Sequence, residues 1–108
     1  GQGSAATVAA GDVRLDIDRR RVTVADREVH LTPTEYELLK TLAINAGKIL
    51  TQRTLLRAVW GPGYEAEGHY LRVHIGRLRR KIEPDPAQPR YIQTVWGVGY
   101  VFVPDGAA

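Results

Sequence analysis

Residues 69–82 read HYLRVHIGRLRRKI, and this stretch has the spacing of an amphipathic helix. At about 100° per residue, one narrow apolar stripe spanning about 60° contains Leu71, Ile75, Leu78 and Ile82. The opposite side, with Arg72 at its flank, carries Arg72, Val73, Gly76, Arg77 and Arg80. The pattern predicts a helix that packs on a core through its apolar stripe and turns its arginines outward.

Arginine is the main basic residue on this outward side, and its chemistry suits nucleic acid. A planar guanidinium can donate two parallel hydrogen bonds to guanine O6 and N7 or to a phosphate, which an ammonium group cannot do. Val73 suits a thymine methyl, and Gly76 leaves room for a base or phosphate to approach the helix backbone. Two plainer interpretations stay open. The arginines could form a solvated helix face, and Gly76 could be neutral drift, although glycine destabilises a helix interior by about 1 kcal/mol.

The charge excess of the chain is concentrated around this helix. The 108 residues include 15 Lys and Arg against 12 Asp and Glu, which gives a net charge of +3. Residues 1–68 carry nine charges of each sign, whereas residues 69–108 carry six basic and three acidic side chains. A local basic cluster of this kind is expected of a nucleic-acid surface.

Capping signals predict two more helices before this one. Thr32 and Glu35 have the spacing of a capping box, which starts a helix whose apolar side ends before Gly47. A second helix starts at Thr51 and ends at Gly61.

The segments that follow predict a wing. A glycine-rich loop over residues 61–68 leads into the third helix, which must end by Pro84. Two β-rich runs, residues 91–96 and 100–103, then form a hairpin. Three helices followed by a hairpin, the third helix being basic and amphipathic, make a winged helix-turn-helix.

Apolar and polar residues alternate in the N-terminal part of the chain, as they do in β-strands with one buried face. Residues 13–17, 22–24 and 29–31 read as a three-stranded antiparallel meander. Residues 1–10 are small, uncharged and aperiodic, so we expect an expression remnant or an interdomain linker there. The predicted domain therefore covers residues 11–105, with residues 106–108 as a tail.

Three runs in this order resemble the effector domain of bacterial OmpR/PhoB-type two-component response regulators. They are LTPTEYELLKTLAINAGKILTQRTLLRAVWG (residues 31–61), HYLRVHIGRLRRKIEPDP (69–86) and YIQTVWGVGYVF (91–102). The resemblance extends over about residues 13–104. Within the family, the run from residue 69 is most similar to regulators of potassium transport.

The resemblance implies an α+β fold: a winged helix-turn-helix with an N-terminal four-stranded antiparallel sheet, three helices and a C-terminal β-hairpin wing. The fourth strand of the sheet is expected near Ile49 and Leu50. The implied function is sequence-specific binding of double-stranded DNA and regulation of transcription, including that of a potassium-uptake operon. The implied partners are RNA polymerase, an N-terminal receiver domain absent from this chain, the cognate sensor kinase acting on that domain, and a second copy on tandem DNA half-sites.

The resemblance also assigns roles to single residues. The base-facing set is Arg72, Val73, Gly76, Arg77 and Arg80. At the DNA backbone the resemblance places Trp60, His69, Thr94 and Tyr100. Thr51, Arg53 and Arg79 are also expected there, the first two because they lie at a helix N-terminus, where free N–H groups and a partial positive charge favour a phosphate. The loop expected to meet RNA polymerase includes Pro62, Tyr64, Glu65 and Glu67.

The wing departs from the family pattern. Relatives often read TVRGxGYRF, with an arginine that enters the minor groove, whereas this chain has Trp96 and Val101 at the two arginine positions. Trp96, at the wing tip, could stack on sugar and backbone, or it could pack on the third helix or on a neighbouring protomer.

Other function classes find little support. Without cysteine there is no disulfide, thiol nucleophile or zinc ribbon, and His69 and His74 point about 140° apart on the helix, so we expect no metal, no cofactor and no enzyme activity. No apolar stretch approaches membrane-spanning length, and no signal peptide is evident, so a cytoplasmic protein without membrane contact is expected. The alternative to DNA binding is a winged-helix protein-interaction module.

Overall fold

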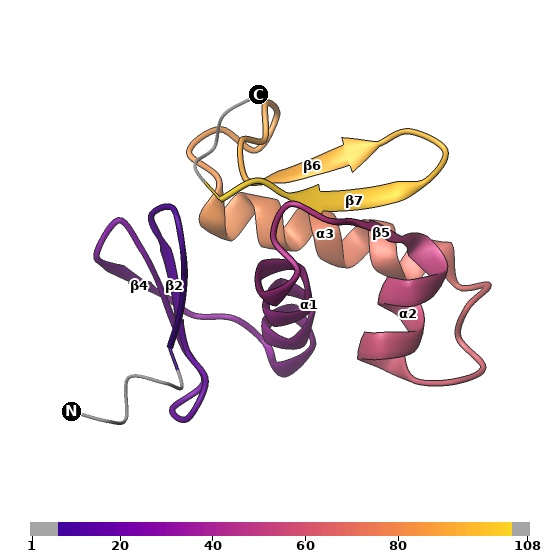
Figure 1. The fold of residues 1–108 in the computed structure, drawn as a ribbon, viewed down its shortest axis with the longest axis horizontal. Helices are drawn as coiled ribbons and strands as arrows, with labels where there is room; N and C mark the ends of the chain where they lie inside the picture. The colour runs from indigo at the N-terminus through magenta and orange to yellow at the C-terminus, as the bar shows by residue number, and fades with distance from the viewer. Residues whose placement is uncertain (1–6, 105–108) are drawn as a thin grey trace.

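The computed structural model describes residues 7–104, which form two antiparallel sheets and three helices (Figure 1). In chain order the elements are β1 (Thr7–Ala10), β2 (Val13–Asp16), β3 (Arg21–Val24), β4 (Arg27–Val29), α1 (Pro33–Ile44), β5 (Ile49–Thr51), α2 (Gln52–Trp60), α3 (Gly68–Ile82), β6 (Ile92–Val95) and β7 (Gly99–Phe102). The β6–β7 hairpin lies along α3, which confirms the predicted winged helix-turn-helix (Figure 1).

The first sheet has four strands in the order β1-β2-β3-β4, as the family resemblance implied. Its fourth strand, however, is not the one predicted. Thr7–Ala10 form β1 and pair with β2, from Thr7 opposite Asp16 to Ala10 opposite Val13. The prediction that residues 1–10 lie outside the fold is therefore wrong for residues 7–10, and residues 1–6 and 105–108 lie outside the described part of the chain.

A tight turn makes this pairing possible. Gly11 has a φ of +64°, and a Cβ built there would lie 1.7 Å from the carbonyl oxygen of Pro104, so only glycine fits. The residues of β1 are mostly small, and a sequence without a run of β-branched residues gave no strand signal.

Ile49 and Leu50 belong to the second sheet, whose order is β5-β7-β6. Ile49 lies opposite Val101 and Leu50 opposite Tyr100, so the prediction that they complete the N-terminal sheet is wrong. Their close pairing with β7 needs Gly99, where a Cβ would lie 2.0 Å from the carbonyl oxygen of Leu50. The wing is therefore a three-stranded sheet that is continuous with the start of α2.

The helix caps agree with the sequence. Thr32 Oγ1 accepts the N–H of Glu35 at 3.2 Å, and Glu35 Oε1 accepts the N–H of Thr32 at 3.0 Å, which completes the capping box of α1. Thr51 caps α2 and Gly61 ends it with a φ of +103°.

One hydrophobic core joins all these elements. The apolar stripe of α3 is at most 3% exposed, which confirms its predicted burial. It packs in the same cluster as Leu39 of α1, Leu55 of α2, Leu15 of β2 and Phe102 of β7. None of the helices within residues 7–104 has the length and apolar character needed to cross a membrane.

Candidate nucleic-acid interface

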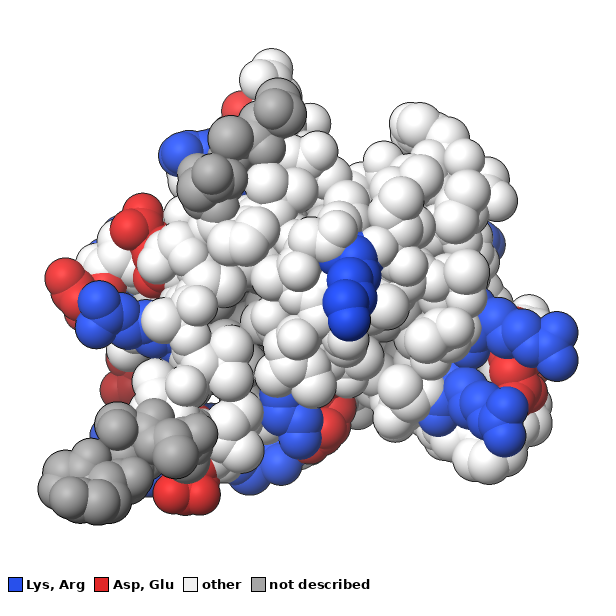
Figure 2. Space-filling view, in the orientation of Figure 1, with Lys and Arg blue, Asp and Glu red and all other residues white. Residues whose placement is uncertain are grey.

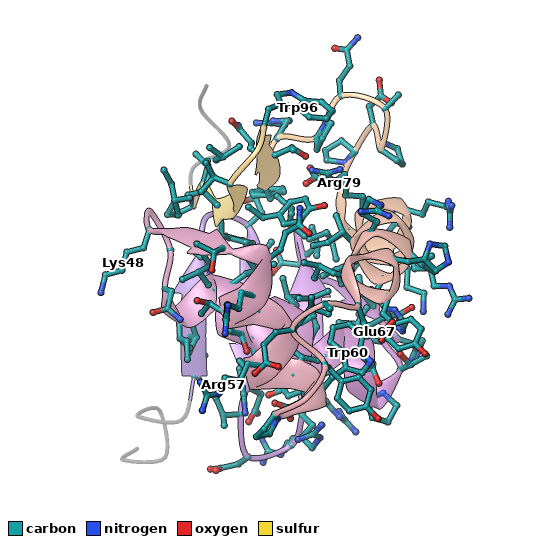
Figure 3. All side chains as sticks on the ribbon, turned by 90° about the vertical axis from the view of Figure 1, so that its right-hand side faces the viewer. Lys48, Arg57, Trp60, Glu67, Arg79 and Trp96 are labelled. Atoms are coloured by element: carbon teal, nitrogen blue, oxygen red, sulfur yellow. The ribbon has the colours of Figure 1, made fainter. Side chains whose placement is uncertain are left out.

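The outward side of α3 presents three exposed arginines. Arg72, Arg77 and Arg80 are all solvent-exposed, and none of them forms an ion pair with a described residue. Val73 and Gly76 lie between them and are half-buried. Figure 3 shows nitrogen-tipped side chains projecting from the side of α3 that is turned away from the rest of the fold. We call Arg72, Val73, Gly76, Arg77 and Arg80 the reading surface.

The face seen in Figure 1 is different. Figure 2 shows it to be mostly uncharged, with one isolated basic side chain near its centre and the other charges toward its edges. In Figure 3, where the view is turned by 90°, Lys48 projects to one side and the basic side chains of α3 to the other. The three exposed and unpaired arginines of α3 give the reading surface its local positive charge.

Arg79 has a structural role that the sequence did not reveal. Its Nε and Nη2 donate to the carbonyl oxygen of Ile92 at 3.1 and 2.8 Å, and Nη2 also donates to Thr94 Oγ1 at 2.8 Å. The guanidinium carbon lies 5.8 Å from the ring centroid of Tyr100. Burial lowers the pKa of the Arg79 guanidinium, while the nearby Tyr100 and Glu83 oppose the shift. Arg79 thus joins α3 to the wing, as its position between them in Figure 3 illustrates.

Glu83 makes a second connection between α3 and the wing. It caps the C-terminal end of α3 and is 6% exposed. Its carboxylate accepts the backbone N–H groups of Arg90, Tyr91 and Ile92 at 2.7 to 3.1 Å. A buried carboxylate requires such donors. An acidic residue directly after a basic helix was the available sequence signal for this contact.

Lys81 connects the same helix end to α1. Its Nζ lies 2.6 Å from Glu35 Oε1, and Glu35 is 2% exposed. Burial alone raises the pKa of the Glu35 carboxyl, but the bonds from Lys81 and Thr32 outweigh burial and hold this pKa below its ordinary value. The sequence predicted only the capping role of Glu35.

The first turn of α2 has fewer free N–H groups than predicted. Thr51 Oγ1 accepts the N–H of Thr54 at 3.1 Å, and the N–H of Gln52 donates to the carbonyl oxygen of Val98 in the wing at 3.3 Å. The N–H of Arg53 has no acceptor among residues 7–104. Thr51 and Arg53 are both exposed, but only part of the expected phosphate-binding terminus is available.

Trp60 packs beside the N-terminal half of α3. Its ring centroid lies 5.1 Å from that of His74 in an edge-on arrangement and 6.4 Å from that of Tyr70. His69 is exposed in the first turn of α3. Trp60, the last residue of α2, and Glu67, which directly precedes α3, lie at the two ends of the loop between these helices and are labelled in Figure 3.

That loop presents most of its predicted partner-facing residues to solvent. Pro62, Tyr64 and Glu67 are exposed, whereas Glu65 is half-buried. Glu65 Oε1 accepts the N–H of Gly63 at 3.0 Å, and the other carboxylate oxygen lies 4.0 Å from Nε of Arg57. Glu65 therefore contacts both the backbone of the loop and the side chain of Arg57 on α2.

The wing tip exposes its tryptophan. Trp96 is 88% exposed, so packing on the third helix of the same chain is excluded, and stacking on DNA or contact with a neighbouring protomer stays open. Val98 beside it is 44% exposed. Thr94 and Tyr100, predicted to touch the DNA backbone, are turned inward: the Thr94 hydroxyl accepts from Arg79 and Tyr100 is 7% exposed.

No group of histidine, cysteine, aspartate and glutamate side chains with the arrangement of a metal site occurs within residues 7–104. This side of the molecule carries exposed guanidinium groups on α3, with aromatic rings and a free backbone N–H group close to the helix. Such a surface can bind an anionic polymer and contact its bases.

Comparison with known proteins places this surface in a family. A family model described as "Transcriptional regulatory protein, C terminal" matches residues 26–102. KdpE of Escherichia coli, a KDP operon transcriptional regulatory protein, is 51% identical over 92 residues, which are 85% of this chain and 41% of that protein. KdpE of Mycobacterium tuberculosis is 48% identical over 88 residues, 82% of this chain and 39% of that protein. The chain thus spans about two fifths of the length of these regulators.

Solved structures agree with the fold. The RstA DNA-binding domain of Klebsiella pneumoniae, in complex with the RstA box, has a TM-score of 0.83 at 32% identity and covers 91% of this chain and 97% of that chain. DrrB of Thermotoga maritima, an OmpR/PhoB homologue, has a TM-score of 0.82 at 38% identity, over 91% of this chain and 44% of that chain. The family is one of transcription-factor domains and not of enzymes, and it favours DNA binding over the protein-interaction alternative. The chain belongs to the family of C-terminal domains of transcriptional regulatory proteins and is a winged-helix DNA-binding domain of the OmpR/PhoB type.

Proposed function

We propose that this chain is the effector part of a two-component response regulator that controls a potassium-uptake operon. The observation that carries the DNA-binding role is the reading surface, in which three unpaired arginines share one side of a helix whose other side is buried. The similarity to two KdpE proteins supports the potassium operon as the regulated target.

In the proposed complex, α3 enters the major groove, which is about 12 Å wide. Arg77 and Arg80 read guanine edges, Val73 meets a thymine methyl, and Gly76 allows close approach of the helix backbone. Arg72 reaches the border of the same groove.

The DNA backbone is proposed to lie against both ends of α2 and the start of α3. Thr51 and Arg53 receive a phosphate on one side, and Trp60 and His69 contact the backbone on the other. Trp96 at the wing tip stacks on sugar and backbone, since an indole 88% exposed to water gains from being covered. Arg79, Thr94 and Tyr100 then act by holding the wing against α3.

The remaining partners belong to the longer protein. We propose that a receiver domain precedes this chain and is phosphorylated by a sensor kinase, which favours dimers on tandem half-sites. The loop containing Pro62, Tyr64, Glu65 and Glu67 would meet RNA polymerase. A regulator of transcription with these partners acts in the cytoplasm.

The decisive experiment is selection of bound sequences from a random duplex pool. Recovery of a direct repeat with half-sites about one helical turn apart supports paired binding by a response-regulator effector. Presence of that repeat upstream of a potassium-uptake operon supports the proposed target. A pool with no enrichment after selection contradicts sequence-specific reading.

Arg77→Ala tests the reading surface itself. Loss of a good bidentate contact should reduce discrimination between the selected and a random duplex by about 1 to 3 kcal/mol. If the variant weakens both duplexes equally across a salt series, Arg77 contacts phosphate only. If the unaltered domain binds no duplex even at low salt, the DNA-binding proposal fails.

A further inference from the structure

A groove lies between the β3–β4 hairpin and the C-terminal end of α3. It has a volume of about 370 Å³, and its lining includes Val24, Arg27, Glu28, Arg80, Lys81 and Glu83. β4 is an edge strand of the N-terminal sheet, so the groove opens at the border of that sheet. Arg80 belongs both to this groove and to the reading surface, which makes the two continuous.

Two of the charged side chains in the groove are already engaged. Both oxygens of Glu83 accept backbone N–H groups, and Lys81 pairs with Glu35. Glu28 pairs with Thr23 across the strands, so its side chain lies on the opposite face of the sheet, where its Oε2 is 3.9 Å from Nε of Arg21. Arg27 and Arg80 form no ion pair with a described residue, so the groove presents two uncompensated guanidinium groups.

Strand register explains why Arg27 faces the groove. Directly paired residues of neighbouring strands share one face of a sheet. Arg27 pairs with Val24, and Val24 pairs with Val13, which is fully buried. Arg27 therefore lies on the face that turns toward the helices. Arg14 pairs with Thr23 and lies on the opposite face.

The position of the groove relative to α3 suggests its ligand. Arg80 is one helical turn after Gly76, so the groove begins where the reading surface ends. A helix that occupies the major groove is flanked by the phosphates of the DNA strands. The C-terminal end of a helix carries a partial negative charge, and an anion there needs cations such as these two arginines.

We propose that Arg27, together with Arg80, binds a backbone phosphate of the DNA at the C-terminal end of α3. The N-terminal sheet then takes part in DNA binding and is more than a support for the helices. This inference rests on the DNA-binding function and extends its contact area to β4.

The test compares Arg27→Ala with Arg14→Ala in duplex titrations over a salt series. The two variants remove the same charge from exposed positions of one sheet, but from opposite faces. Arg27→Ala should reduce the slope of log K against log salt by about 1, and the affinity by roughly eightfold at 0.1 M salt, for selected and random duplexes alike. Arg14→Ala should leave the slope unchanged. Arg27→Lys should retain most of the slope, because the ammonium group of lysine also pairs with a phosphate.

Thermal melting of each variant shows whether the fold is retained. Equal slopes for Arg27→Ala and Arg14→Ala overturn the inference while leaving DNA binding intact, because the unaltered domain still binds duplex. A second arm replaces chloride by inorganic phosphate at constant ionic strength, with the Arg27 side-chain N–H observed by NMR. A saturating shift with inorganic phosphate, together with an unchanged DNA slope in Arg27→Ala, assigns the groove to a small anion and also overturns it.

Discussion

Gly76 lies at the centre of the reading surface, and replacing it by alanine should change stability and DNA affinity in opposite directions. Apart from the backbone of its own helix, a Cβ at this position would have one neighbour within 4 Å among the described residues, the side-chain Nη2 atom of Arg80 on the same helix at 3.9 Å, which is ordinary contact. The free protein therefore has room for the methyl group. Since alanine is favoured over glycine in a helix interior by about 1 kcal/mol, Gly76→Ala should be more stable by up to that amount.

The magnitude can be measured by thermal melting, where 1 kcal/mol corresponds to roughly 4–8 °C for a domain of this size. In the complex the added methyl meets a base or phosphate that approaches the bare backbone. Overpacking of this kind destabilises by about 1–3 kcal/mol, so affinity for the selected duplex should fall roughly fivefold or more.

Gly47→Ala is the matched control. Gly47 also has open space around its Cβ position, but its φ is +84°, which strains any L side chain. This variant should melt lower by an amount equivalent to about 1–2 kcal/mol and bind DNA as before. If Gly76→Ala is less stable, the helix-propensity argument is wrong. If it binds the selected duplex as tightly as the unaltered domain, no DNA group approaches Gly76 and the glycine has no role in reading.

Three further predictions concern the contacts around α3. Glu35→Gln should lower the free energy of unfolding by about 1–3 kcal/mol near neutral pH. The lowered pKa of this carboxyl means that its stabilisation is present above its ordinary pKa of 4.5 and lost as pH falls through the folded value, so urea melts at about pH 2 should show no difference. Arg79→Lys should destabilise by roughly 2 kcal/mol because an ammonium on a flexible stem cannot reproduce the three hydrogen bonds that the planar guanidinium donates to Ile92 and Thr94; unchanged stability contradicts this role. Trp96→Ala should weaken DNA binding without changing the salt slope or the melting temperature, whereas Trp96→Arg should raise the slope by about 1; equal affinity of the alanine variant contradicts stacking.

The helices could be predicted from the sequence because their signals are local. Capping at Thr32 and Thr51 involves residues three positions apart, and the stripe of α3 repeats within one helix. These local signals were sufficient to predict the fold class and the outward position of the reading surface. Neither depends on knowing which distant segments meet.

The meander of β2, β3 and β4 and the β6–β7 hairpin were predicted, but the places of β1 and β5 were not. Thr7–Ala10 become a strand only because β2 supplies the partners and because Gly11 can turn tightly against Pro104. Ile49 joins the wing because β7, some 50 residues later, pairs with β5 and offers Gly99 where Leu50 and Thr51 approach closely. The pairing of β5 with β7 spans such a separation and is set by packing of the whole domain, whereas the pairing of β1 with β2 is local and was missed because Thr7–Ala10 are mostly small.

The last turns of α3 carry three consecutive basic residues, Arg79, Arg80 and Lys81, and helical geometry predicts that they point in different directions. Measured from Leu71, Arg80 falls at about 180°, opposite the buried stripe, whereas Arg79 and Lys81 fall about 80° to either side of it. Side chains at the two borders of a buried stripe can reach the elements packed on each side, and here Arg79 reaches β6 while Lys81 reaches Glu35 of α1. The three consecutive cations therefore differ in their contacts: Arg79 binds the wing, Lys81 binds α1, and Arg80 is exposed to solvent. Because Arg79 and Glu83 attach the wing to the turn that carries Arg80, the wing and the reading surface are held in a fixed relative position, and in the proposed complex they would approach the DNA together.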